Sequence, residues 1–260
     1  LILDKCKALS AVHRIFLVAA ACMGCGFDAR LVHLAIGHPM PSYGSESSIC
    51  SDLQRLGLIE SVSLSTGSTS LSWPHRFAHD KVQQACLQMI DSVELEWMDP
   101  VEDEYISASF HLAIGRHLWV ELTERDEVHE HCSLVTFLLG RGVSLIIGDD
   151  ERFATAELFL YTSRQKFTTA NYLAVDSLVD TAMHLLPSRS WRDMPDLTLE
   201  AHLAAVQIKL ILGDSGEAWR LSDEVIQNSD SLHGSHVAYA AKIHVMGASN
   251  RIDQAIAIAL

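Results

Sequence analysis

The sequence from about residue 100 onward is dominated by apolar residues at helical spacing, and this pattern constrains the fold most. Apolar side chains recur every three or four residues, and short polar segments separate the apolar runs. Helices joined by such short loops pack as antiparallel neighbours, so we expect a stack of helix pairs. The predicted helices cover residues 102–122, 126–140, 150–163, 166–186, 196–212, 215–228, 235–247 and 251–260.

Two of these helix pairs share a repeat-like turn. The string ILGDSGEAWRLSDEVIQ places Gly213 and Asp214 in the turn, Ala218 at a tight helix contact and Val225 at a later small position. In the string MGASNRIDQAIAIAL, Ala255 matches Ala218 at an interval of 37 residues. A tetratricopeptide unit has about 34 residues, so the spacing predicts a degenerate TPR-like array.

The first hundred residues follow a different pattern. Helical spacing predicts helices at 5–23, 28–36 and 45–56, with Asp28 as the N-cap of the second and Gly57 ending the third. A winged helix has three helices followed by a β-hairpin. The fold prediction therefore depends on whether the segment after residue 57 forms a hairpin.

That next segment alternates as strands do. LIESVSL (58–64) and TSLSW (69–73) flank the turn STGS (65–68), and Pro74 is expected to end the hairpin. The predicted fold is therefore mainly α. A winged-helix domain with a small β-hairpin covers residues 1–95, and a TPR-like α-helical repeat array covers residues 96–260.

Charge and composition exclude several classes of protein. The net charge of −14 argues against nucleic acid as a main partner, because phosphate binding needs clustered Lys and Arg. No apolar run reaches the ~18 residues of a membrane span. The cysteines sit in apolar helical contexts rather than in a disulfide framework, so we expect a cytoplasmic protein. Because the sequence starts at Leu1 rather than Met, we expect a piece of a longer chain.

Two groups of residues resemble metal sites only superficially. Cys22 and Cys25, with His33 and His38, are spaced too tightly for a usual zinc finger, and the two cysteines end an apolar helix. We expect packed cysteines there and no bound metal.

The second group is Glu127, His129, Glu130 and His131. The two histidines are two residues apart on one helix, so their side chains point in different directions. We expect a solvated helix face.

Catalytic and DNA-binding signatures are also missing. GRGVSLIIGDDE (140–151) lacks the G-x-x-x-x-G-K-[ST] pattern of a phosphate loop, and the sequence has no nucleophile motif. The third helix carries Glu46 and Asp52 against Arg55, which is a poor charge pattern for reading DNA. We therefore predict a non-enzymatic chain that does not bind DNA.

The string RFAHDKVQQACLQMI contains a His-Asp pair before an apolar helix face. Asp80 is at the position of an N-cap, and Gln83 could complete a capping box. His79 has no such local role, which leaves it as the one candidate functional side chain.

The order of several strings resembles the region that follows the ATPase core in STAND/AAA-type "predicted ATPase" signalling proteins. The strings are FLVAAACMGCGFD, LQRLGLIE, RFAHDKVQQACLQMI, HLAIGRHL and AELFLYTSRQKFTTANYLAVDSL, and F-x-H-D-x-V-Q-Q-A is the most specific part. The resemblance covers about residues 5–260. In particular, the chain is similar to hybrid histidine kinases that combine a kinase-like domain, an ATPase module, helical repeats and a histidine kinase.

This resemblance implies a regulatory segment that couples nucleotide state to signalling output. In STAND ATPases a histidine in a Met-His-Asp-like motif, at the end of the winged helix, senses the diphosphate of ADP. His79 is at the matching place, with Ala78 where the motif has Met, so the resemblance implies that His79 donates to a nucleotide phosphate. ATP or ADP would be bound by an upstream domain, and this segment itself needs no cofactor.

The implied partners are the ATPase domain of the same protein and other proteins bound by the repeats. Two alternatives stay open. The chain could belong to a STAND-type transcriptional regulator with a DNA-binding domain downstream, or it could be a TPR-like scaffold with no ATPase attached.

Overall fold

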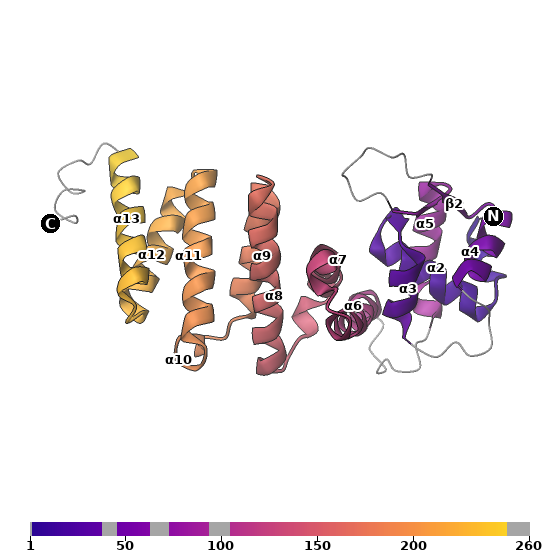
Figure 1. The fold of residues 1–260 in the computed structure, drawn as a ribbon, viewed down its shortest axis with the longest axis horizontal. Coiled ribbons are helices and arrows are strands. Elements are labelled where there is room, and N and C mark those ends of the chain that lie inside the picture. The colour runs from indigo at the N-terminus through magenta and orange to yellow at the C-terminus, as the bar shows by residue number, and fades with distance from the viewer. Residues whose placement is uncertain (1, 38–45, 63–72, 94–104, 249–260) are drawn as a thin grey trace. The chain divides into compact units, whose positions relative to one another are not determined.

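The structure is a computed structural model of the chain and describes residues 2–37, 46–62, 73–93 and 105–248 (Figure 1). These residues are mainly helical, with a small three-stranded antiparallel sheet. By its internal packing the chain divides into two units, residues 1–145 and 146–260.

The described part of the first unit combines helices with the three strands. Its elements are α1 (Ile2–Lys7), α2 (Ala11–Met23), β1 (Gly26–Phe27), α3 (Ala29–Ile36), α4 (Glu46–Arg55), β2 (Ile59–Ser61), β3 (His75–Phe77), α5 (Asp80–Leu87), the 3-10 turn η1 (Ile90–Ser92), α6 (Ile106–Glu124), α7 (Val128–Arg141) and the 3-10 turn η3 (Val143–Leu145).

The described part of the second unit is helical. Its elements are α8 (Asp149–Thr168), α9 (Tyr172–Leu185), α10 (Ser190–Asp193), α11 (Pro195–Leu212), α12 (Ser215–Asn228) and α13 (Leu232–Ala248).

The sheet has the order β1-β3-β2, and both pairings are antiparallel. β3 lies in the middle, where His75 is opposite Phe27 of β1 and Phe77 is opposite Ile59 of β2. The sheet therefore joins a strand that follows α2 to two strands that follow α4.

The predicted hairpin is only partly correct. The predicted strand at 58–64 contains the shorter β2, while the turn at 65–68 and most of the strand at 69–73 lie outside the described residues. The prediction that Pro74 ends the hairpin is wrong, because β3 begins directly after it. β1 was not predicted, since a two-residue strand shows no alternation.

Aromatic side chains from three separate elements form the centre of the first unit. Phe27 is fully buried, and its ring centroid lies 6.0 Å from that of Phe16 on α2 and 5.4 Å from that of Phe77 on β3. His75 stacks on Phe27 with its ring 5.7 Å away. Rings at these separations attract one another beyond the gain from burial, so they fix the sheet against α2.

The helix ends in this unit follow capping chemistry. The predicted helix at 5–23 is two helices, because the hydroxyl of Ser10 accepts a backbone N–H in the first turn of α2 and starts a new helix. The predicted cap of α3 is confirmed, since Asp28 accepts the N–H of Arg30 at 2.8 Å. Gly57 lies two residues after the end of α4 and has a φ of 67°, which agrees with the prediction that it stops this helix.

The helices α6 and α7 belong to the first unit, although the sequence predicted that the repeat array starts at residue 96. α6 packs on α3, and α7 contacts α2. The boundary between the two compact units therefore follows Leu145 and does not fall at residues 95–96.

The second unit is built from helix pairs. α8 packs on α9, α11 packs on α12, and α13 lies against both α11 and α12 (Figure 1). The prediction that a helix ends at residue 163 is wrong, because the Ser163 hydroxyl donates to the carbonyl of Leu160 and α8 continues. The reversal comes at Ala170, which has a φ of 55°. The four-residue α10 was not predicted.

The turn between α11 and α12 has the predicted chemistry. Gly213 ends α11 in the left-handed conformation with φ of 81°, and the Asp214 carboxylate accepts the N–H of Glu217 at 3.1 Å. Ala218 and Val225 are fully buried, as predicted. The predicted helix at 251–260, with Ala255, lies outside the described residues.

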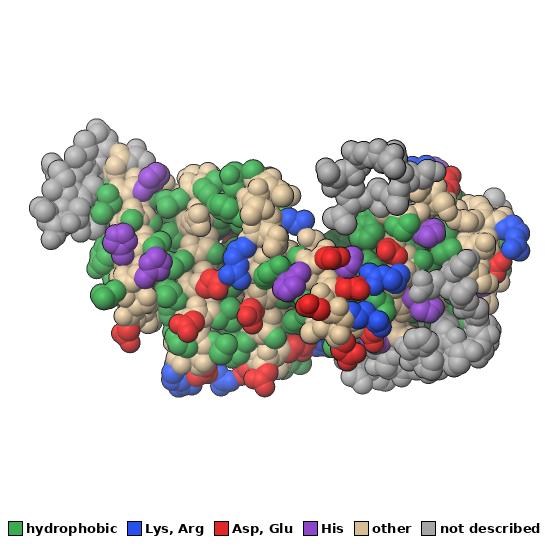
Figure 2. All heavy atoms as spheres, viewed as in Figure 1, with side chains coloured by type: hydrophobic (Ala, Val, Ile, Leu, Met, Phe, Trp, Pro, Cys, Tyr) green, Lys and Arg blue, Asp and Glu red, His purple; other side chains and the backbone are tan. Residues whose placement is uncertain are grey.

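The surface mixes apolar groups with charges of both signs (Figure 2). Histidines gather over α13, whose sequence contains His233, His236 and His244. In the described ranges, no helix combines the length and apolar character needed to cross a membrane.

Candidate functional site

An open groove of about 790 Å³ runs along α11 and α13 and is called here the α11–α13 groove. Its floor is apolar and comes from one stripe of α11 and one of α13. The apolar lining residues are Leu199, Leu203, Ala204, Val206, Leu210, Val237, Ala240 and Ala241.

Helical spacing explains the stripe on α11. Leu199, Leu203, Val206 and Leu210 recur at intervals of three and four residues, which places them along one face. Gly234 lets α13 approach this face, because a Cβ atom there would lie 2.7 Å from a methyl group of Leu199. The groove is open because the apolar residues that α13 contributes to its lining, Val237, Ala240 and Ala241, have small side chains.

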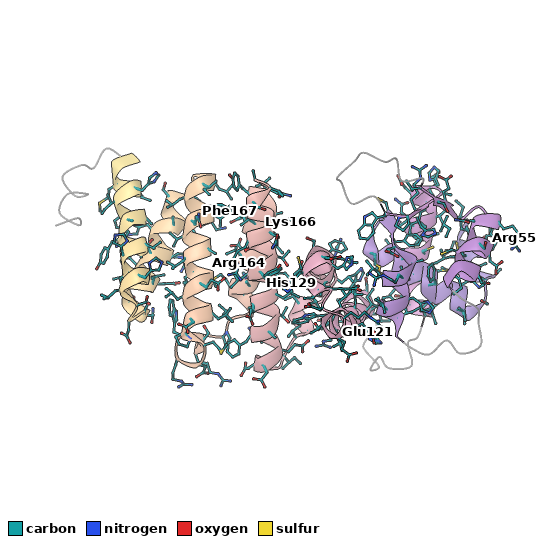
Figure 3. All side chains as sticks on the ribbon, in the orientation of Figure 1. Arg55, Glu121, His129, Arg164, Lys166 and Phe167 are labelled. Atoms are coloured by element: carbon teal, nitrogen blue, oxygen red, sulfur yellow. The ribbon has the colours of Figure 1, made fainter. Side chains whose placement is uncertain are left out.

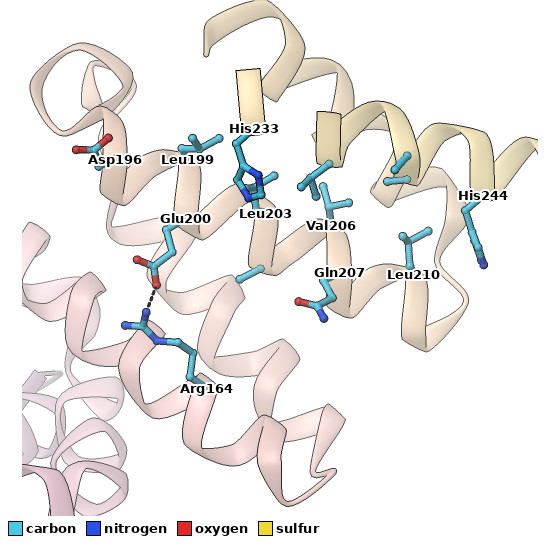
Figure 4. Close-up of a pocket in the computed structure, with 14 residues that line it drawn as sticks. Arg164, Asp196, Leu199, Glu200, Leu203, Val206, Gln207, Leu210, His233 and His244 are labelled. Atoms are coloured by element: carbon cyan, nitrogen blue, oxygen red, sulfur yellow. Dashed lines mark ion pairs between the residues drawn. The ribbon is translucent and has the colours of Figure 1, made fainter. Parts of the chain in front are cut away.

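The edges of the groove carry polar and charged groups. Arg164 of α8 reaches Glu200 of α11 and forms an ion pair of 2.8 Å, as the close-up shows (Figure 4). Asp196 and the two histidines His233 and His244 also line the groove. An apolar floor with a mixed-charge edge suits the binding of an amphipathic peptide segment. Among the described residues that line the groove, none is a Ser, Thr or Cys that could act as a nucleophile.

His79 is an exposed N-cap. Its Nδ1 accepts the backbone N–H of Lys81 at 3.0 Å, so the proton of the neutral ring is on Nε2. The predictions that Asp80 caps the helix and that His79 has no local role are therefore wrong: Asp80 is the first helical residue. The predicted capping box is also wrong, because the Gln83 amide donates to the carbonyl of Ala21 at 3.1 Å.

The prediction of packed cysteines is confirmed for Cys22 and wrong for Cys25. Cys22 is buried, and burial raises the pKa of its thiol to about 12, whereas Cys25 is exposed. His38 lies outside the described residues. Within the parts of the chain that are described, no cluster of three or more His, Cys, Asp or Glu could hold a metal ion.

The acidic and histidine residues at the start of α7 connect two elements. Glu127 pairs with Arg30 of α3 at 2.6 Å, and this hydrogen bond lowers the pKa of the carboxyl. His131 Nε2 is 3.5 Å from the same guanidinium. His129 of α7, labelled in Figure 3, is exposed. This group stabilises the packing of α7 near α3.

Arg55 and Asp52 of α4 form a local ion pair. Arg55, labelled at the end of α4 in Figure 3, lies 3.1 Å from Asp52. Asp52 is also 3.7 Å from the ring of His13 on α2. An arginine paired in this way adds little positive potential for a phosphate backbone.

Neither the groove nor one buried histidine was predicted from the sequence. His202 of α11 is almost fully buried; its Nδ1 is 2.7 Å from the carbonyl of Thr198, and its Nε2 is 3.2 Å from Glu224. Burial lowers its pKa, while the two acceptors oppose that shift. A signal for the groove existed in the α11 stripe, but the facing residues of α13 are not predictable from spacing alone.

Comparisons with known proteins gave no match: no family model, no curated protein and no solved structure matches the chain.

Proposed function

We propose that this chain is a non-catalytic interaction segment whose α11–α13 groove binds a segment of a partner protein. The observation that carries the proposal is the groove itself, with its apolar floor and charged edge. Leu199 and Leu210 are eleven residues apart on α11, which corresponds to roughly 16 Å at 1.5 Å per residue. That length fits about three turns of a partner helix or a short extended strand.

The helix pairing supports a TPR-like interpretation of the second unit. Each hairpin packs on the next, and the capped turn at Gly213 and Asp214 is followed by the buried Ala218. Arrays of this kind stack neighbouring helix pairs and leave one face open for binding. The groove lies on such a face, between α11 and α13.

The element order supports a winged-helix interpretation of the first unit. A helix, a strand, two helices and two strands follow one another from α2 to β3, and β3 pairs with both other strands. Together with the resemblance of the sequence strings, this order favours a regulatory segment of a cytoplasmic signalling ATPase, as in hybrid histidine kinases.

Within that setting, His79 would report the nucleotide state of the ATPase domain. Its Nδ1 is occupied by the helix cap, so the exposed ring presents Nε2–H as a donor. A donor beside a helix N-terminus is suited to a phosphate group. This second function rests on one residue, whereas the groove rests on two helices.

The groove is tested with peptides selected from a random library for binding to this chain. Leu203→Lys places a charge on the apolar floor and should weaken peptide binding at least tenfold in a fluorescence titration. Ile147→Lys is the matched control, because Ile147 is 85% exposed and does not line the groove. Equal affinities for the two variants would rule out the groove as the binding site.

The role of His79 is tested in the full-length protein with two variants. His79→Asn keeps a side chain that caps helices well, whereas His79→Ala removes the cap and the ring donor together. Both should lower ADP affinity, and only the alanine variant should also lower stability. Unchanged ADP affinity in both variants would exclude the sensor role and leave His79 as a helix cap.

A further inference from the structure

Two cysteine side chains lie against each other inside the first unit. Cys6 of α1 and Cys86 of α5 are both fully buried, and their thiols form a hydrogen bond. The helices that carry them pack together, although α2, α3, α4 and the sheet separate them in the sequence. Sequence patterns assigned no functional role to either side chain, and neither lines the α11–α13 groove.

The contact gives the two thiols different chemistry. The hydrogen bond with Cys86 lowers the pKa of Cys6, and the same bond, followed by burial, raises the pKa of Cys86. These two directions favour Cys6 as the thiolate of the pair. Cys22 lies close enough to influence Cys86, but burial keeps Cys22 as a neutral thiol.

The short helix α1 provides a route to the buried pair. It has six residues, and a break before Ser10 separates it from α2. A helix of this length has little stability of its own, so its opening costs less than unfolding of the whole unit. Opening of α1 brings Cys6 into contact with small solutes in the solvent.

We propose that Cys6 and Cys86 are an oxidisable pair that closes to a disulfide when the protein meets a peroxide. The Cys6 sulfur attacks one oxygen of hydrogen peroxide and the O–O bond breaks. Cys6 becomes a sulfenic acid, and the leaving hydroxide takes the thiol proton and departs as water. The Cys86 sulfur then attacks the Cys6 sulfur and the S–O bond breaks, which releases a second water with the Cys86 proton. Peroxide gains two electrons, and the pair loses two hydrogen atoms.

The disulfide would fasten α1 covalently to α5. His79 caps α5, so oxidation would restrain the helix that positions this histidine. Because the closed loop includes α2, α3, α4 and the sheet, the bond would also restrict the unfolded chain. Oxidation would therefore regulate the stability of the first unit and leave the second unit unaffected.

The test uses the whole 260-residue chain with Cys25→Ser, which removes the exposed thiol and with it intermolecular bonds. The folded protein is treated with hydrogen peroxide, denatured, alkylated with N-ethylmaleimide and digested for mass spectrometry without reduction. Peptides of Cys6 and Cys86 should appear joined, while Cys22, Cys50 and Cys132 are alkylated. In the same oxidation in urea, the preference for this pair should vanish. The proposal is overturned if Cys6 stays alkylated after oxidation, or if it joins Cys22 as often as Cys86.

Two serine variants test the order of attack. With Cys86→Ser, the sulfenic acid on Cys6 has no partner and should be trapped by dimedone. With Cys6→Ser, Cys86 should remain unlabelled. Labelling of Cys86 instead would contradict the assignment of Cys6 as the attacking thiol. If circular dichroism shows that a variant does not fold, the Cys25→Ser protein still tests the proposal. Its oxidised form should melt at a higher temperature, and dithiothreitol should reverse the shift.

Discussion

The two units are stabilised in different ways. The centre of the first unit joins side chains that are far apart in the sequence: Phe16 on α2, Phe27 on β1 and Phe77 on β3. The second unit packs each helix mainly on its neighbours in the sequence, with small residues such as Ala201 and Ala218 fully buried between helices. The first unit therefore depends on a few central contacts, whereas the second distributes its stability along the chain.

Ion pairs between helices also contribute to the stability of the second unit. In the second unit, Lys209 of α11 reaches Asp176 and Asp180 of α9 at 2.7 and 3.1 Å. Burial alone would lower the pKa of Lys209, but hydrogen bonds to the two carboxylates raise it. Such pairs connect successive helices and fix their register, while the aromatic cluster of the first unit holds separate elements in one core.

Among the substitutions proposed, Phe27→Ala should destabilise the protein most. Truncating this fully buried ring should cost about 3–5 kcal/mol and should open the whole first unit. Hydrogen exchange read by mass spectrometry should show increased exchange in α2, the sheet and α5, with the second unit unchanged. Phe137→Ala, at a 45% exposed position of α7, is the control and should have a small effect. Increased exchange across both units would refute the idea that they are stabilised independently.

A smaller and more local effect is expected from Ala218→Leu. The added atoms have no space at a fully buried contact, so the change should cost about 1–3 kcal/mol. Exchange should increase in α11, α12 and α13 but not in the first unit. Ala154→Leu, at an exposed position of α8, should leave exchange unaltered. If α8 and α9 open as much as α12 in the Ala218 variant, stability does not follow the nearest-neighbour description.

Gly213→Ala should cost about 1 kcal/mol, because φ of 81° strains any residue with a Cβ atom. No atom lies within 4 Å of the added methyl group, so the cost is one of backbone conformation alone. Gly148→Ala is the matched control: its φ is −69°, and the methyl group there is equally unobstructed. The two variants are compared by urea unfolding, and equal midpoints would contradict the assigned role of Gly213.

The smallest effect per residue concerns pH. Burial lowers the pKa of His75, His111 and His117 in the first unit and of His202 in the second. Below the ordinary histidine value of about 6.5, the unfolded chain binds more protons than the folded one. The stability that these neutral histidines contribute is therefore fully present above that pH and is lost as pH falls below it.

The loss between pH 7.5 and 5.5 should be larger in the first unit, which contains three of these histidines. Hydrogen exchange at the two pH values, corrected for the intrinsic rate, measures it for each unit. His111→Leu should reduce the loss in the first unit, since one buried titrating group is removed. An undiminished loss in this variant would exclude His111 as a contributor.

Capping chemistry could be predicted from sequence where one residue decides it. Asp28 was predicted correctly as an N-cap, because an aspartate before an apolar helical run has few other local roles. Asp214 was predicted only as a residue of the turn, and the structure makes it the N-cap of α12. His79 and Asp80 were assigned in the wrong order, because either side chain can accept the first N–H groups of a helix. Which of the two side chains does so depends on the position and direction of the backbone at the end of β3.

Local sequence patterns suffice to predict the helical character of this protein, the polar turns between its helices and the apolar stripe on α11, since each depends on residues within a few turns of one another. Three features become visible only in the folded chain: α6 and α7 pack with the first unit, α13 faces α11 across a groove, and Cys6 contacts Cys86. These contacts join residues distant in the chain, and their free energy depends on shape and burial, which no local pattern encodes.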